Sequence, residues 1–270
     1  MSAPSTEAKP GANNAAALLR QVSEKYGSLS TLSVTGKTTA QVTPAGGGEP
    51  STVENAFSIN LARPEFYRIE WKQPLAGTVV SQGAVWSAGS GHRVLIGQKV
   101  SEWLNREQAL GAATGVSGGA ANTLPSLFFK DEGSGLHEFI QNATFLPDES
   151  VGGESCQIIK GDGPGGKLTL WISRKDLFLK QIQMVSSGGG GTQEAASVSS
   201  ETMTKIAKTL GTDASPEAVS KMTREIEAQQ MRVAAMRTTI TETFERVVAN
   251  EMMIKADFEV AVPAGAPGPK

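Results

Sequence analysis

The chain has 270 residues, of which 39% are hydrophobic, and a formal net charge of −2 at pH 7. This length and apolar content suffice for one large domain, whereas the near-neutral charge gives no electrostatic basis for binding nucleic acid or an anionic membrane surface. The single cysteine, Cys156, excludes an internal disulfide and a thiolate metal cluster. No apolar run approaches the ~20 residues that span a bilayer. Two histidines are too few to indicate a metal site, and the sequence predicts neither a metal nor a cofactor.

Residues 1–14 are small and polar, and they predict a flexible tether. They lack the basic start and apolar centre of a signal peptide. They fit a segment that follows a signal-peptide cleavage site or a lipidated cysteine; the frayed end of a cytosolic protein is the alternative. Helical spacing of apolar residues then predicts a helix over 15–27, ended by Gly27. Residues 265–270 are expected to be a flexible tail.

Short segments of alternating apolar and polar residues follow, separated by turn residues such as Gly83. This pattern predicts an antiparallel sheet with one buried and one solvated face. Strands are expected at 32–42, 56–62, 66–71, 78–81, 84–88, 93–96, 155–160, 167–173, 180–186, 239–247 and 252–262. Short helices are expected at 104–113, 125–129 and 136–140, with Thr123 capping the second. Roughly ten strands exceed what a flat sheet holds without curling, so strong curvature is predicted.

A glycine-rich break interrupts the strand pattern at residues 188–237, which begin with four glycines. Its second half opens with Ser215-Pro216-Glu217, a capped helix start with proline in the first turn. Apolar residues then recur at helical spacing. The segment is therefore predicted to be a helical hairpin inserted into a single domain of residues 15–264. Its apolar stripe either packs against its own sheet or forms a mobile lid or a partner surface.

Three blocks of sequence stand out by their order and spacing. They are residues 57–74, which contain Arg63-Pro64, residues 81–86, which end at Trp86, and residues 256–263. In these blocks the chain resembles the LolA-like clan of periplasmic carriers, which includes LolA, LppX-type lipid carriers and the amino-terminal domain of RseB. The resemblance implies a strongly curved antiparallel half-barrel covered by short helices, with acyl chains held between the sheet and the helical lid.

The resemblance implies a non-enzymatic periplasmic protein, free or membrane-anchored as a lipoprotein, that binds lipid or lipoprotein acyl chains and acts as a carrier between envelope proteins. It also implies that Arg63 hydrogen-bonds to the lid and controls whether the cavity is open. The insertion departs from the plain carrier pattern and favours a separate periplasmic branch of the clan, with the lipid left open.

The residues expected to line the cavity lie on the apolar face of the strands or on the covering helices. For any one of them, plain core packing is the alternative interpretation. The expected lining residues are Phe57, Ile59, Leu61, Tyr67, Ile69, Trp71, Val85, Leu168, Leu170, Ile172, Ile182, Met184, Phe128, Phe129 and Phe139.

Two other functions stay open. An envelope sensor or adaptor, as RseB is, would act through protein contacts of the 188–237 insertion. A serine hydrolase would use Ser117, because residues 115–119 match a nucleophile elbow and Asp131 and His137 follow in the order of α/β-hydrolases. Small residues flank Ser117 where an elbow needs a buried strand and a helix, so a small-residue loop is the simpler interpretation.

Overall fold

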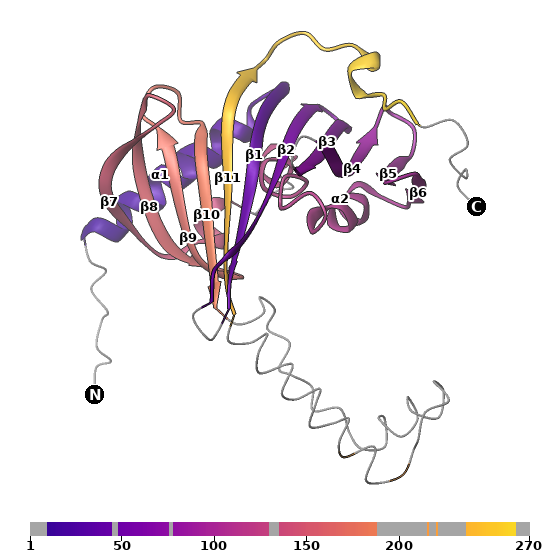
Figure 1. The fold of residues 1–270 in the computed structure, drawn as a ribbon. Helices are drawn as coiled ribbons and strands as arrows, with labels where there is room; N and C mark the ends of the chain where they lie inside the picture. Colours follow the sequence, from indigo (N-terminus) through magenta and orange to yellow (C-terminus); the bar gives the residue numbers. More distant parts are fainter. Residues whose placement is uncertain are drawn as a thin grey trace.

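A computed structural model describes residues 10–44, 48–75, 78–129, 135–187, 215, 220 and 236–262. Eleven strands of this part of the chain form one open sheet in the order β6-β5-β4-β3-β2-β1-β11-β10-β9-β8-β7 (Figure 1). Every neighbouring pair is antiparallel. The predicted fold class, a mainly β protein with a curved antiparallel sheet and covering helices, is confirmed.

The strands follow the alternating segments of the sequence closely in the centre of the sheet. Their bounds are β1 Thr31–Thr43, β2 Ser51–Ala62, β3 Phe66–Leu75, β4 Thr78–Ser87, β5 His92–Ile96, β6 Lys99–Trp103, β7 Gln141–Val151, β8 Glu154–Gly163, β9 Gly166–Ser173, β10 Leu179–Ser187 and β11 Arg237–Ala249.

The helices are α1 Pro10–Gly27, α2 Arg106–Thr114, α3 Thr123–Phe128 and α4 Leu136–Phe139, and a 3-10 helix, η1, spans Lys255–Phe258. In Figure 1, α1 passes behind β7 to β10, whereas α2 lies beside β4 to β6. The start of α1 at Pro10 shortens the predicted tether, since proline suits a first helical turn. Near its end, the Tyr26 hydroxyl accepts a hydrogen bond from the Leu179 amide (3.1 Å), which ties α1 to β10.

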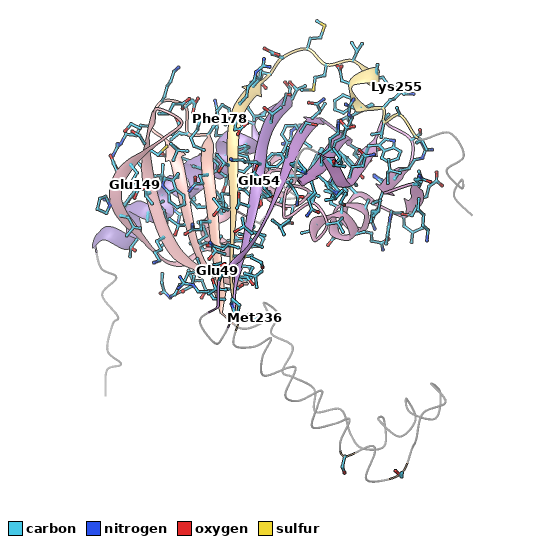
Figure 2. The ribbon with its side chains drawn as sticks, viewed as in Figure 1. Glu49, Glu54, Glu149, Phe178, Met236 and Lys255 are labelled. Carbon is cyan, nitrogen blue, oxygen red and sulfur yellow. The ribbon has the colours of Figure 1, made fainter. Side chains whose placement is uncertain are left out.

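One main core lies between the inner face of the sheet and the helices. Leu19, Val22 and Tyr26 of α1 join it, together with buried residues of α2, α3 and α4. Figure 2 shows the side chains that project from the sheet and the helices. Strand residues alternate between this core and the outer face. Val85, for example, belongs to the main core, whereas its neighbours Ala84 and Trp86 belong to a small cluster with Leu95 and Val100.

Two strand glycines stand where the sheet leaves no space for a side chain. Gly83 does not end a strand as predicted but lies inside β4, where a Cβ would overlap the Trp71 ring and come within 2.6 Å of the Leu95 carbonyl oxygen. Gly36 lies at a register shift between β1 and β11, where a Cβ would come within 2.8 Å of Phe57 Cζ. Such irregularities bend a strand and increase its local twist.

Both edge strands were missing from the prediction. β6 is only five residues long, and most side chains of β7 are exposed, so neither carries a clear apolar alternation. Pro147 lies within β7, and proline in a sheet is confined to edges and bulges.

The predicted strand at 252–262 is wrong. This segment leaves β11 and crosses above β1 to β4 in Figure 1, forming η1 on the way. Its Phe258 ring packs on Phe66 with centroids 5.5 Å apart, and the Arg68 guanidinium donates to the Glu259 carbonyl oxygen (3.2 Å). Phe258 and Val260 therefore pack on the outer surface of the sheet, whereas Met252 and Ile254 are exposed and no residue of the segment pairs with an edge strand.

The predicted helical hairpin at 188–237 lies outside the described residues, apart from Ser215, Ser220, Met236 and Arg237, and stays a prediction. The ends of the segment are described. Ser187 of β10 stands opposite Arg237 of β11, so residues 188–236 connect two strands that pair directly with each other.

The substitution Gly83→Ala tests the close packing inside β4. Because the added Cβ meets the Trp71 ring, the free energy of unfolding is expected to fall by about 1–3 kcal/mol. Chemical denaturation measures it. The control is Gly111→Ala on α2, where a Cβ meets nothing within 4 Å and the variant should be neutral or slightly more stable. Equal effects of the two substitutions would contradict the packing argument.

Candidate functional site

Most of the residues predicted to line a cavity share one place, the main core between the sheet and the helices. Phe139 is the exception, since its side chain is 49% exposed. In the short helix α4, Leu136 and Ile140 lie four positions apart and both face the core, which turns Phe139 outward. Leu168 is partly buried against the core, Met184 is half-buried, and the buried members are Phe57, Ile59, Leu61, Tyr67, Ile69, Trp71, Val85, Leu170, Ile172, Ile182, Phe128 and Phe129.

The apolar inner face continues to the end of the strands, where its residues are partly exposed. One residue from each of five neighbouring strands stands opposite the next, and we call this set the end row. It consists of Val53 on β2, Ala40 on β1, Ile240 on β11, Met184 on β10 and Leu168 on β9. Val53 is 41% exposed and the other four are of intermediate burial. Met236 and Glu49, labelled in Figure 2, lie at this end of the sheet.

Directly behind the end row lies a buried polar row. Glu242 of β11 stands opposite Thr38 of β1, and Thr38 stands opposite Asn55 of β2. Their side chains are almost fully enclosed, with relative exposures of 6% for Glu242 and 1% for Thr38. The row shares the inner face with the core because Phe57 and Phe244 lie two residues further along the same strands.

Residues from the helical side cover this polar row. The Thr123 hydroxyl of α3 donates a 2.7 Å hydrogen bond to Glu242 Oε1. The backbone of Gly118 and Gly119 lies so close that a Cβ would come within 2.5 Å of Thr38 Oγ1 and of Glu242 Oε1, respectively. Both glycines have positive φ, at 68° and 105°, a conformation that other residues rarely adopt.

The ionisation of Glu242 is controlled by its burial. Loss of solvation raises the pKa of its carboxyl group from 4.5 to about 7, and the hydrogen bond from Thr123 opposes this rise. Among the described residues, Glu242 Oε2 and Thr38 Oγ1 have no hydrogen-bond partner. Sequence reasoning missed Glu242, although the signal was present. It lies between Ile240 and Phe244 on one face of an alternating strand.

Arg63 joins the turn after β2 to two helices. Its Nε donates to the Leu29 carbonyl oxygen (3.0 Å), and its Nη2 donates to the carbonyl oxygens of Gly27 (2.7 Å) and Phe128 (2.5 Å). The guanidinium also lies over the Phe128 ring, 4.9 Å from its centroid. Carbonyl groups at helix ends lack intrahelical partners, so this cation satisfies both the end of α1 and the end of α3.

The short helix α3 is thus attached to the sheet at both ends by polar contacts. Arg63 holds its last residue, Phe128, and Glu242 holds its first residue, Thr123. The predicted cap role of Thr123 is wrong, because the helix begins at Thr123 itself and the preceding Asn122 occupies the cap position. Leu124, Leu127 and Phe128 of α3 are buried against the core.

Ser117 is held as a structural residue of the turn that follows α2. It is fully buried, and its hydroxyl donates to the Thr114 carbonyl oxygen and accepts from the Ala121 amide, both at 3.1 Å. A nucleophile elbow instead exposes its serine at the end of a strand. Asp131, the second member of the hypothetical triad, lies outside the described residues.

Two further properties concern the part of the chain that the structure describes. No three side chains of the types that bind metals come together there. Within the same residues, no helix combines the length and apolar character that crossing a membrane requires.

Comparison with known proteins gives matches at the level of the fold. No family model matches the sequence, and no curated protein matches it. LprF from Mycobacterium bovis is 11% identical, with a TM-score of 0.42, over 94% of this chain and 98% of that chain. LppX from Mycobacterium tuberculosis is 10% identical, with a TM-score of 0.39, over 90% and 98%. A LolA superfamily protein from Nitrosomonas europaea is 9% identical, with a TM-score of 0.31, over 91% and 97%.

Members of the LolA-like clan are thus among the solved structures that this chain resembles. This is the clan predicted from the residues around Arg63-Pro64 and Trp86. At identities near 10% the likeness concerns the overall arrangement of sheet and helices.

The substitution Arg63→Leu tests whether this cation holds α3. Loss of its charge-assisted hydrogen bonds is expected to lower the free energy of unfolding by about 1–2 kcal/mol and to increase hydrogen exchange of the α3 amides. Exchange mass spectrometry of a peptide covering α3 measures the second effect.

Arg93→Leu is the matched control, because Arg93 forms an exposed ion pair with Glu102 (3.0 Å) and stands opposite Trp86, on the outer face of the sheet away from α3. Such pairs contribute about 0–1 kcal/mol, and α3 exchange should not change. Unaltered α3 exchange in Arg63→Leu would show that the apolar contacts of α3 hold it alone.

Proposed function

We propose that this protein is a non-enzymatic periplasmic lipid-binding protein that holds acyl chains of lipids or lipoproteins between the curved sheet and its covering helices. The observation that carries the proposal is the end row. Val53, Ala40, Ile240, Met184 and Leu168 continue the apolar inner face past the covering helices and leave it partly in water. An acyl chain entering there would follow β10 and β9, where Met184 and Leu168 lead inward to the buried Ile182 and Leu170, beside the polar row.

The size of the hydrophobic effect explains why such a protein also needs a way to release its ligand. Burial of an acyl chain contributes about 0.8 kcal/mol per methylene, so a long chain gains on the order of 10 kcal/mol. Release requires that part of this gain be offset by contacts that form only when the protein is closed and empty.

Arg63 supplies contacts of this kind. Its bonds to Gly27 and Phe128 join α1, the β2–β3 turn and α3, so movement of α3 away from the sheet would break them. A chain entering between sheet and helices would displace α3 and lose these bonds. Arg63 thereby favours the empty closed state and lowers the affinity for the ligand, which makes transfer to another envelope protein easier.

Binding is tested with a fluorescent acyl ester that carries no charge, titrated into the purified protein. Met184→Arg places a cation in the end row and is expected to weaken binding at least tenfold, because the acyl chain must then pass a charged group. Met184 is already half-buried at the end of the strands, so thermal unfolding should change little.

Val79→Arg is the control, since Val79 is 49% exposed and lies on β4, outside the end row. It adds the same charge and should leave binding unchanged. Solvent extraction of the purified protein gives a second measurement. The proposed function would be overturned if the protein takes up no ester and no lipid co-purifies with it. Equal weakening of binding by both variants would overturn the role of the end row.

A further inference from the structure

The polar row beneath α3 has no part in holding an apolar chain, and its geometry calls for an explanation. Buried polar atoms in native proteins are nearly always paired, and each unpaired one costs about 1–3 kcal/mol. Here Glu242 Oε2 and Thr38 Oγ1 lie on opposite residues of paired strands, and neither has a partner among the described residues.

We propose that Glu242 is a second latch residue of α3, which fastens the amino-terminal end of the helix while protonated and releases it on ionisation. The inference rests on the proposed function, in which α3 belongs to the lid. Glu242 would act as a positioning residue, since it touches the lid and not the acyl chain.

Two contacts of the Glu242 carboxyl group come from the lid side. Thr123 Oγ1 donates to Oε1 at 2.7 Å, and the Gly119 backbone leaves no room for a side chain above the same oxygen. Displacement of α3 and of the glycines before it would therefore give water access to the carboxyl group and to the Thr38 hydroxyl. The closed state leaves two polar atoms unpaired, and the open state solvates both.

Charged groups around Glu242 do not compensate its ionisation. The only charged residue of β1, Lys37, pairs with Glu54 (3.3 Å), and the only one of β10, Lys180, pairs with Glu154 (3.0 Å). The residues opposite Glu242 on these strands are Thr38 and Ile182. α3 and residues 115–122 contain no ionisable side chain. A carboxylate formed under the closed lid would thus meet one hydroxyl donor and no cation in the described residues.

The direction of the pH dependence follows from burial. In the closed state the pKa of Glu242 is raised to about 7, whereas a solvated glutamate titrates near 4.5. The contribution of Glu242 to the stability of the closed state is therefore fully present below about pH 4.5. It decreases as the pH rises from there to about 7 and is lost above about pH 7. Within that window the opening equilibrium constant increases by up to about tenfold per pH unit.

Hydrogen exchange of the α3 amides in the lipid-free protein tests the proposal. The rate in the unaltered protein is divided by the rate in Glu242→Gln at the same pH, which cancels the intrinsic pH dependence of exchange. Glutamine keeps the size and the acceptor oxygen but cannot ionise. The ratio is expected to be about a few-fold at pH 5 and at least tenfold higher again at pH 8.

Glu245→Gln is the matched control, because Glu245 lies on the same strand but is exposed. The α3 amides of Glu245→Gln should exchange at the same rate as those of the unaltered protein at both pH values. A ratio that does not change between pH 5 and pH 8 overturns the proposal, as does an equal effect of Glu245→Gln. If Glu242→Gln does not fold, the α3 peptide is compared with the α1 peptide of the unaltered protein, and parallel pH profiles overturn the proposal.

Thr123→Val provides a second variant that removes only the hydroxyl donor. It is expected to increase α3 exchange at pH 5, where the latch is closed, and to have a smaller effect at pH 8; an equal effect at both would overturn the latch. No lipid is present in this experiment, so its outcome is independent of the binding test. The latch can be overturned while the acyl ester still binds, and the latch can be supported while the ester does not bind.

Discussion

The packing of the interior depends on two strand residues that have no side chain. The Trp71 ring packs across Gly83 of β4 and the Phe57 ring across Gly36 of β1, because a Cβ at either glycine would collide with the ring. Large aromatic rings on the inner face thus occupy the space that two strand residues leave empty. The same arrangement encloses one interior, and α1 to α4 cover it because an uncovered apolar face of eleven strands would lie in water.

How much of this was predictable from the sequence depends on burial. Central strands such as β1 and β3 alternate between core and solvent, and their positions were predicted within a few residues. β6 and β7 at the edges bury little, so the alternation that marks a strand is weak there. The segment at 252–262 alternates too, yet it crosses the outer face of the sheet without pairing. Alternation indicates that one side of a segment is buried, but it does not indicate that the backbone pairs with a neighbouring strand.

The candidate site shows the same limit. The buried apolar residues of the core could be predicted from periodicity, and Arg63 could be singled out by its place before Pro64 in a recognisable block. The partners of Arg63 could not, because Gly27 and Phe128 offer only backbone carbonyl groups that any sequence would supply. Glu242 was visible as a polar residue on an apolar face, but its meaning depends on Thr123 and Gly119, which are brought to it by tertiary packing.

The polar contacts of α3 differ in what breaks them. Arg63 is a cation that is exposed to solvent, so its bonds respond to movement of the helix and to salt. Glu242 is enclosed and has a raised pKa, so its contact responds to proton concentration. The two ends of one short helix are thus attached by contacts that respond to different conditions.

The pairing of Ser187 with Arg237 has a consequence for how the length of the chain can change in evolution. Two residues that face each other across adjacent strands can be joined by a tight hairpin turn or by a segment of any greater length. The entropic cost of a longer connection grows only with the logarithm of its length. Material can therefore be gained or lost between these two positions without altering the strand register, and this junction is a place where relatives of the protein are free to differ in size.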